Sequence, residues 1–177
     1  MRYAILISIA AGCGSSGSTG GDPKAFIGVY ATTTHTQAQS PGSTVACTAA
    51  GTPVTNGKPF FKLAVDTFFM DPMILRLSGC DDSAGTACID TLTSMRSGGP
   101  GLEDESANSQ TGGGLPCQLH YEHATATLTG TAIQLVIDTK YEYASTIPDA
   151  QCTYEKALAL GMSPDCLTVE RWAGTLR

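Results

Sequence analysis

Residues 133–143 read IQLVIDTKYEY, and this stretch decides the fold class. Every second residue from Ile133 onward is apolar, aromatic or Thr, and most of the residues between them are polar or charged. One predicted face therefore consists of Ile133, Leu135, Ile137, Thr139, Tyr141 and Tyr143. Because side chains alternate between the two faces of a strand, the pattern predicts a strand with one buried and one solvated face.

The residues before this strand extend it into a hairpin. Residues 118–128 are rich in Thr and aromatic side chains, and Thr129-Gly130 supplies a glycine that tolerates a positive φ angle. We therefore expect residues 118–128 and 133–143 to pair as a long antiparallel hairpin. Further strands are predicted at residues 26–35, 43–48, 60–69, 73–78, 87–93 and 166–175.

Short turns and one helix complete the expected domain. Asn56-Gly57 and Asp71-Pro72 are dipeptides that favour turns between strands. Residues 153–160 are mostly good helix formers and are followed by Gly161, so a short helix is predicted there. About eight strands joined by short turns imply one mainly β domain over residues 25–177, either an antiparallel barrel or a sandwich.

One long segment lacks the apolar alternation of a strand. Residues 94–116 are rich in Gly and Ser, contain the acidic run Glu103-Asp104-Glu105 and have almost no apolar side chains. Such a segment buries too little surface to offset the entropy lost on ordering. We therefore expect a mobile loop over residues 94–116.

The overall composition excludes several classes of protein. The chain has 177 residues, a formal net charge of -6 and only 15% charged residues. Nucleic-acid binding needs clustered Lys and Arg, so we expect no nucleic-acid partner. A hydrophobic content of 42% is too high for a wholly disordered chain.

The N-terminus has the pattern of an export signal. Met1-Arg2 precede an apolar run at residues 3–11, which is too short to cross a bilayer as a helix but fits a secretory signal. Ala10-Ala11-Gly12-Cys13 follows. This sequence resembles the lipobox of bacterial lipoproteins, in which small residues precede a cysteine that becomes lipidated.

The lipoprotein resemblance implies an anchor and a location. It makes residues 1–12 a signal peptide, Cys13 the lipidated N-terminus and residues 13–24 a flexible Gly/Ser tether. Gly14, rather than Asp, after the cysteine implies a protein anchored in the bacterial outer membrane. The alternative is an ordinary secretory signal cut near residues 10–12, which leaves Cys13 as a free thiol.

The remaining cysteines are expected to form disulfides. The chain has seven cysteines, so setting Cys13 aside leaves six, and no Cys-x-x-Cys spacing points to zinc or thioredoxin-like chemistry. In an exported protein six such cysteines predict three disulfides, for which fifteen pairings exist. The pairs we expect are Cys80 with Cys88, Cys152 with Cys166 around the helix, and Cys47 with Cys117.

Catalytic and metal-binding patterns are weak. In the sequence HYEH at residues 120–123, alternation puts His120 and Glu122 on one face and His123 on the other. His35 could meet His120 and Glu122 across strands as a metal site, but ordinary surface or hydrogen-bonded roles are expected. The acidic runs at residues 81–82 and 103–105 lack the spacing of a calcium loop. No Gly-x-Ser-x-Gly elbow or phosphate loop occurs, so neither an enzyme nor a cofactor is expected.

The first predicted strand resembles that of lipocalin-type barrels. Residues 26–30, FIGVY, are similar to the Gly-x-Trp opening of that family, with Tyr30 in place of Trp. Arg171 is similar to the arginine that packs over this ring from the last barrel strand. The resemblance implies that Gly28, Tyr30 and Arg171 close the barrel, and that a small apolar ligand occupies its mouth.

Two functions remain open for the domain. The first is a membrane-anchored, non-catalytic structural or interaction module that meets another protein of the cell envelope. The second is a lipocalin-like binder, which needs a cavity of about 300 Å³ or more that is open at one end. A metal-dependent enzyme is the weakest alternative. The residues expected to line the cavity of a binder are Leu135, Ile137, Tyr141 and Trp172.

Overall fold

This computed structural model describes residues 21–39, 44–66, 73–98, 101–112, 115–144, 148 and 151–177. Within these residues, eight antiparallel strands form a barrel. The barrel strands are β1 (Gly28–Gln39), β4 (Phe60–Val65), β5 (Leu75–Cys80), β6 (Cys88–Gly98), β7 (Gly101–Gly112), β8 (Leu115–Thr129), β9 (Ala132–Ala144) and β11 (Thr168–Leu176). The smaller elements are η1 (Pro23–Phe26), β2 (Val45–Ala46), β3 (Thr52–Pro53), α1 (Tyr154–Ala159), η3 (Leu160–Met162) and β10 (Asp165–Cys166).

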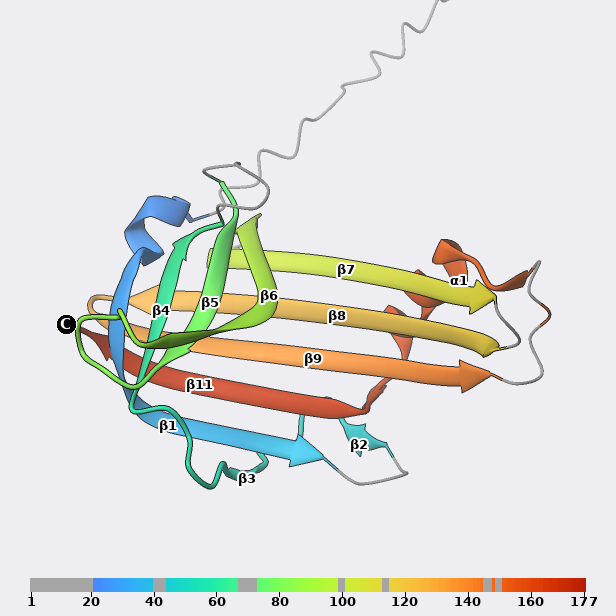
Figure 1. Cartoon of the computed structure of the whole chain (residues 1–177), viewed down its shortest axis with the longest axis horizontal. Helices are drawn as coiled ribbons and strands as arrows, with labels where there is room; N and C mark the ends of the chain where they lie inside the picture. Colours follow the sequence, from blue (N-terminus) through green and yellow to red (C-terminus); the bar gives the residue numbers. More distant parts are fainter. Residues whose placement is uncertain are drawn as a thin grey trace, which may run out of the picture.

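The barrel closes between its first and last strands. Each barrel strand pairs with the next along the chain, in the order β1, β4, β5, β6, β7, β8, β9 and β11, and β11 returns to pair with β1 (Figure 1). Gly130 has a φ angle of 62° in the β8–β9 turn, and Asn56 has one of 58° in the predicted turn at residues 56–57. The predicted turn at residues 71–72 lies outside the described residues. This topology confirms an antiparallel barrel rather than a sandwich.

One end of the barrel is filled with apolar side chains. The buried cluster includes Phe26, Tyr30, Phe61, Leu63, Leu75, Leu77, Met95, Leu102, Ala124, Ala126, Ile133, Leu135, Ile137 and Trp172. Tyr30 stacks on Phe61 with ring centroids 5.2 Å apart, and its hydroxyl donates to the Phe26 carbonyl at 2.8 Å. Burial of this phenol raises the pKa of Tyr30 to about 12. The alternation in residues 133–143 therefore marks a core strand, as predicted.

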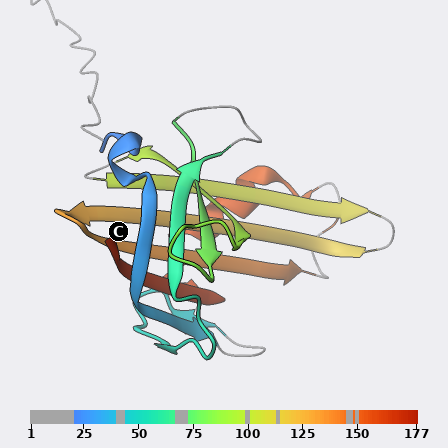
Figure 2. The same ribbon diagram turned by 60° about the vertical axis from the view of Figure 1, so that its left-hand side comes forward.

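The long strands continue beyond this packed end. β4 pairs only with residues 28–31 of β1, and β7 pairs only with residues 96–98 of β6. Past these points β7, β8, β9, β11 and β1 run on as one sheet (Figures 1 and 2). On its outer face α1 packs with Ala157 against Cys117 and Leu119. The inner face of these five extended strands lies past the points where the β1–β4 and β6–β7 pairings end.

The single predicted helix is confirmed as α1, continued by η3. Thr153 precedes α1 in an extended conformation, and its hydroxyl oxygen accepts from the Lys156 backbone N–H, as an N-cap residue does. Within the described ranges, no helix has both the length and the apolar character needed to cross a membrane.

The expectation of a mobile loop at residues 94–116 was wrong. The segment holds the end of β6, all of β7 and the start of β8. β7 pairs with β8 from Leu102 opposite Ala126 to Gln110 opposite Gln118, and Leu102 belongs to the core. Backbone hydrogen bonds to a neighbouring long strand therefore order a segment whose side chains are mostly polar.

The domain also begins earlier than the expected boundary at residue 25. The Gly21 N–H donates to the Gly101 carbonyl at 3.0 Å, and Pro23 is buried at the start of η1. Residues 21–24, expected to be part of the flexible tether, therefore belong to the domain. The predicted signal peptide, Cys13 and the rest of the tether lie outside the described residues.

Three disulfides link the six cysteines of the described residues, in the pairs Cys47–Cys166, Cys80–Cys88 and Cys117–Cys152. The expected Cys80–Cys88 pair is confirmed, since these residues lie opposite each other on β5 and β6. The other two expected pairs were wrong. Because α1 packs on the outer face of β8, Cys152 before the helix meets Cys117, and the β10–β2 pairing brings Cys166 to Cys47.

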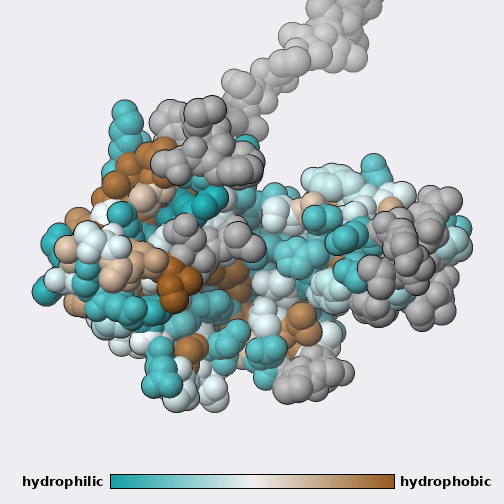
Figure 3. Space-filling view, in the orientation of Figure 1, coloured by the Kyte–Doolittle hydropathy of each residue, from teal (hydrophilic) through white to brown (hydrophobic). Residues whose placement is uncertain are grey.

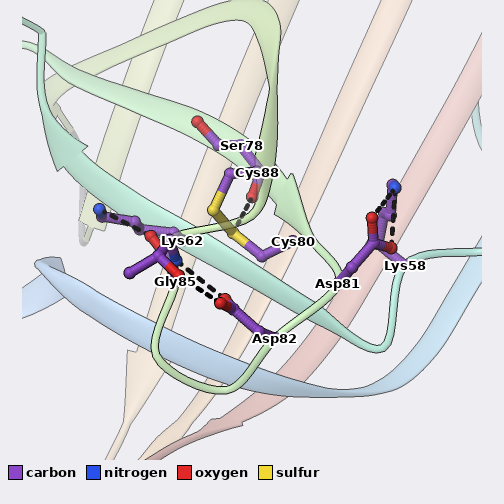
Figure 4. The surroundings of a disulfide bond; sticks show 9 residues. Lys58, Lys62, Ser78, Cys80, Asp81, Asp82, Gly85 and Cys88 are labelled. Atoms are coloured by element: carbon purple, nitrogen blue, oxygen red, sulfur yellow. Dashed lines mark hydrogen bonds and ion pairs between the residues drawn. A yellow bond between two sulfur atoms is a disulfide. The ribbon is translucent and has the colours of Figure 1, made fainter.

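The loop closed by the Cys80–Cys88 bond is held by further polar contacts (Figure 4). Both carboxylate oxygens of Asp81 accept from Lys58 Nζ at 2.8 Å. Asp82 accepts from the backbone N–H and the hydroxyl of Thr86, and these hydrogen bonds hold the pKa of Asp82 below its usual range. The two adjacent aspartates thus have protein partners.

Arg171 does not pack over Tyr30, as the lipocalin resemblance implies. Tyr30 lies opposite Leu176 in the β1–β11 pairing, whereas Arg171 lies opposite Thr36. This register separates the two side chains by about 20 Å along β1. Arg171 Nη2 donates instead to the Cys47 carbonyl at 3.3 Å. The expected closing contact was therefore wrong.

Candidate binding face

Cross-strand register arranges the inner face in rows that become polar away from the core. The row inside the barrel contains Leu102, Ala126, Leu135, Trp172 and His35. The next row contains Asp104, Ala124, Ile137, Glu170 and Gln37. The third contains Ser106, Glu122, Thr139, Thr168 and Gln39. Beyond it lie Asn108, His120 and Tyr141, and then Gln110 and Gln118.

We call the polar and aromatic residues of the last four rows the open face. Its members are Gln37, Gln39, Asp104, Ser106, Asn108, Gln110, Gln118, His120, Glu122, Thr139, Tyr141, Thr168 and Glu170. None of these members is Lys or Arg, and Tyr141 is 38% exposed. The aliphatic residues of the same rows, Ala124 and Ile137, are buried in the core. In Figure 3 mainly teal and white residues cover this part of the sheet. The open face is therefore a surface of hydrogen-bonding groups that includes the exposed ring of Tyr141.

Two carboxylates of the open face are partly buried and have partners. Burial raises the pKa of Glu122, while a hydrogen bond from Thr93 and the nearby His120 oppose the rise. Burial likewise raises the pKa of Asp104, opposed by Arg96, whose Nε lies 3.4 Å from Asp104 Oδ1. These two acidic side chains therefore offer little uncompensated negative charge.

A third carboxylate, Glu170, holds two aromatic side chains where the core meets the open face. Glu170 Oε1 accepts from Trp172 Nε1 at 2.7 Å and lies 2.7 Å from His35 Nε2. The His35 and Trp172 rings are stacked, and Trp172 also lies against Phe61, with centroids 5.5 Å apart. Glu170 is thereby fixed in position, with its carboxylate already engaged.

A cavity of about 380 Å³ lies beside His35, between β1 and the chain that follows β3. Its lining includes four threonines of β1, at positions 32, 33, 34 and 36, together with Lys58. His35 Nδ1 is buried and has no hydrogen-bond partner among the described residues, and a Cβ at Gly57 would lie 3.1 Å from it. The cavity thus combines hydroxyl groups with one imidazole that Glu170 holds at its other nitrogen.

Most of the residues expected to line an apolar cavity lie in the packed core. Leu135, Ile137 and Trp172 are 1%, 5% and 4% exposed. None of them lines the cavities of about 380, 290 and 530 Å³ in the described part of the chain. Tyr141 lies apart from them on the open face. The four residues therefore do not form one pocket.

The histidines do not converge. His120 and Glu122 share the inner face, as alternation predicts, whereas His123 lies on the outer face. His35 lies in the row of Ala126, three strands away from β8 and six residues from His120 along it. Across the described ranges, no three His, Cys, Asp or Glu side chains lie close enough to hold a metal ion.

The amide side chains of the open face were not predicted. Asn108 and Gln110 lie within the segment expected to be a loop, and Gln118 opens the predicted hairpin. Both faces of β7 are mostly polar, so no hydrophobic period reveals the strand. No local pattern therefore marks these amides, because polar side chains occupy both sets of alternating positions in β7.

Comparisons with protein-family models, curated proteins and solved structures find no match for this chain.

Proposed function

We propose that this chain is a lipid-anchored, non-catalytic interaction module of the bacterial cell envelope, and that the open face binds its partner. The contrast between the two ends of the long strands carries this proposal. Toward the barrel, Leu135 and Ile137 are packed among other apolar side chains. Away from it, the same face of β9 carries Thr139 and Tyr141. The surface that meets a partner is therefore polar and lies outside the barrel.

The cysteine count supports a lipid anchor. Six cysteines form disulfides, and Cys13 is the seventh in the sequence. Two or three acyl chains on Cys13 would hold the protein on a membrane much more firmly than one. Gly14 after the cysteine supports the outer membrane as the location.

A lipocalin-like role gains less support from the packing. An apolar ligand inside the barrel would have to displace the core around Leu135, Ile137 and Trp172, which are almost fully buried. A hydrophobic dye added to the protein is therefore expected to leave Trp172 emission unchanged. A saturable change in that emission would instead favour the binder.

Lipid labelling tests the anchor directly. Cells grown with a labelled fatty acid should label the wild-type protein, which should partition with membranes. The Cys13→Ser chain should carry no label and should be released as a folded product with three disulfides. Ser15→Ala, two residues further on, is the matched control and should behave as wild type. Membrane fractionation of the Cys13→Ser chain would contradict the proposal.

A further inference from the structure

We propose that the open face binds a neutral, hydroxyl-rich carbohydrate chain. This inference rests on the proposed function, because it names the chemical class of the partner that the same surface holds. Three observations support it: the face is rich in amide and hydroxyl groups, its carboxylates already have partners, and its rows cross several strands.

Amide and hydroxyl groups dominate the open face. The amides belong to Gln37, Gln39, Asn108, Gln110 and Gln118, and the aliphatic hydroxyls to Ser106, Thr139 and Thr168. A side-chain amide both donates and accepts hydrogen bonds, as does a hydroxyl group, so such groups match sugar hydroxyls in either role. The set contains no Lys or Arg, and Arg96 beside it pairs with Asp104, so the face does not suit a phosphate-rich ligand. The aliphatic side chains of the same rows, Ala124 and Ile137, are buried in the core, so the face does not suit a lipid.

Tyr141 adds an aromatic surface among these polar groups. Tyr141 is 38% exposed, and the His120 ring meets the Tyr141 ring at 64° with centroids 6.5 Å apart. An exposed tyrosine offers a flat apolar ring together with a polar hydroxyl. A sugar ring has an apolar C–H face and polar edges, so it can stack on Tyr141 while its hydroxyl groups reach the neighbouring amides.

The engaged carboxylates favour a neutral sugar over a basic peptide. Glu170 is held by His35 and Trp172, Asp104 is near Arg96, and Glu122 has a raised pKa because of burial. A basic peptide would need ionised carboxylates that remain free to pair with its cations. A neutral ligand uses the amides and hydroxyls without paying to desolvate a charge.

The size of the rows favours a chain over a single sugar. The row of Ser106, Glu122, Thr139, Thr168 and Gln39 crosses five strands. With strands about 4.8 Å apart, this row spans about 19 Å. A ligand that reaches from Ser106 to Gln39, the exposed ends of this row, must therefore be extended, as an oligosaccharide is.

Titration calorimetry on the purified full chain tests this assignment. The probes are an N-acetylglucosamine tetramer, a glucose tetramer, tetralysine and a heparin fragment. Wild type should bind at least one neutral tetramer saturably, and Tyr141→Ala should bind it about tenfold more weakly. Tyr154→Ala is the matched control, because Tyr154 is 53% exposed on α1, on the other side of the sheet, and should change nothing.

A second variant guards against a folding defect. Asn108 is exposed on β7, so Asn108→Ala should keep the wild-type Trp172 emission and still weaken binding of the neutral tetramer. Binding of tetralysine or heparin alone, no binding of either neutral tetramer, or equal losses in Tyr141→Ala and Tyr154→Ala would overturn the carbohydrate assignment. Cys13→Ser should bind as wild type does, so a failed anchor and a failed carbohydrate assignment give different results.

Discussion

The Trp172 indole lies against the His35 imidazole, with ring centroids 3.5 Å apart and planes 18° from parallel. Trp172 is the only tryptophan of the chain, so its emission reports on this contact. His35→Ala should open a gap beside the indole, admit water and shift the emission maximum to longer wavelength. His123→Ala is the control, because His123 lies on the outer face and bonds to Glu103. An unshifted His35→Ala spectrum would contradict the stacking.

A buried ion pair should dominate the stability of the β4–β5 region. Asp66 is fully buried, and Arg76 Nη2 lies 2.9 Å from its Oδ2. Arg76→Ala leaves that carboxylate without its guanidinium, which should lower the free energy of unfolding by about 3 kcal/mol in urea titrations. The double variant Asp66→Asn, Arg76→Ala should lose less, since no buried charge remains. A double variant less stable than the single one would argue against this account.

The raised pKa of Glu122 predicts a pH-dependent gain in stability on substitution. A carboxyl whose pKa is higher in the folded than in the unfolded state contributes most to stability at low pH, and that contribution is lost as the pH rises through the folded pKa. Glu122→Gln should therefore raise the thermal midpoint at pH 7. The gain should vanish in acid, where Glu122 is protonated in both states. Glu142→Gln, at an exposed position of β9, should show no such gain.

The three disulfides should differ in their contributions because they close loops of different length. Their sequence separations are 119, 35 and 8 residues for Cys47–Cys166, Cys117–Cys152 and Cys80–Cys88. Chain entropy predicts contributions of ~5, ~4 and ~2.5 kcal/mol in that order. Paired Cys→Ser variants compared by urea unfolding would measure the ranking. Non-reduced peptide maps should contain these three links, and a fragment joining Cys152 to Cys166 would contradict them.

The hairpin was predictable because its two faces differ in chemistry. Residues 133–143 place apolar side chains on the core face and polar ones outside, and this difference is visible without any partner strand. β7 was not predictable, since Asp104, Ser106 and Asn108 face one way and Glu103, Glu105 and Ser109 the other. Both sets are polar, and the strand is ordered by its pairing with β8, which no local pattern encodes.

The candidate binding face was predictable only in part for a similar reason. Alternation correctly put Leu135, Ile137 and Tyr141 on one face of a strand. It cannot tell where that face leaves the barrel, because this depends on where the pairing of β4 with β1 ends. Two of the three disulfide pairings were predicted wrongly for the same reason, since they depend on where α1 and β10 pack against distant strands.

The closure of the barrel by β11 has a consequence for how the chain acquires its fold. Thr168–Leu176 hydrogen-bonds to β1 on one side and to β9 on the other, so both partners have an unpaired edge until residue 176 is available. Pairing between segments so far apart in sequence is slow to form, and open edges invite aggregation. A chain that stops before residue 168 should therefore yield a self-associating open sheet rather than a smaller barrel.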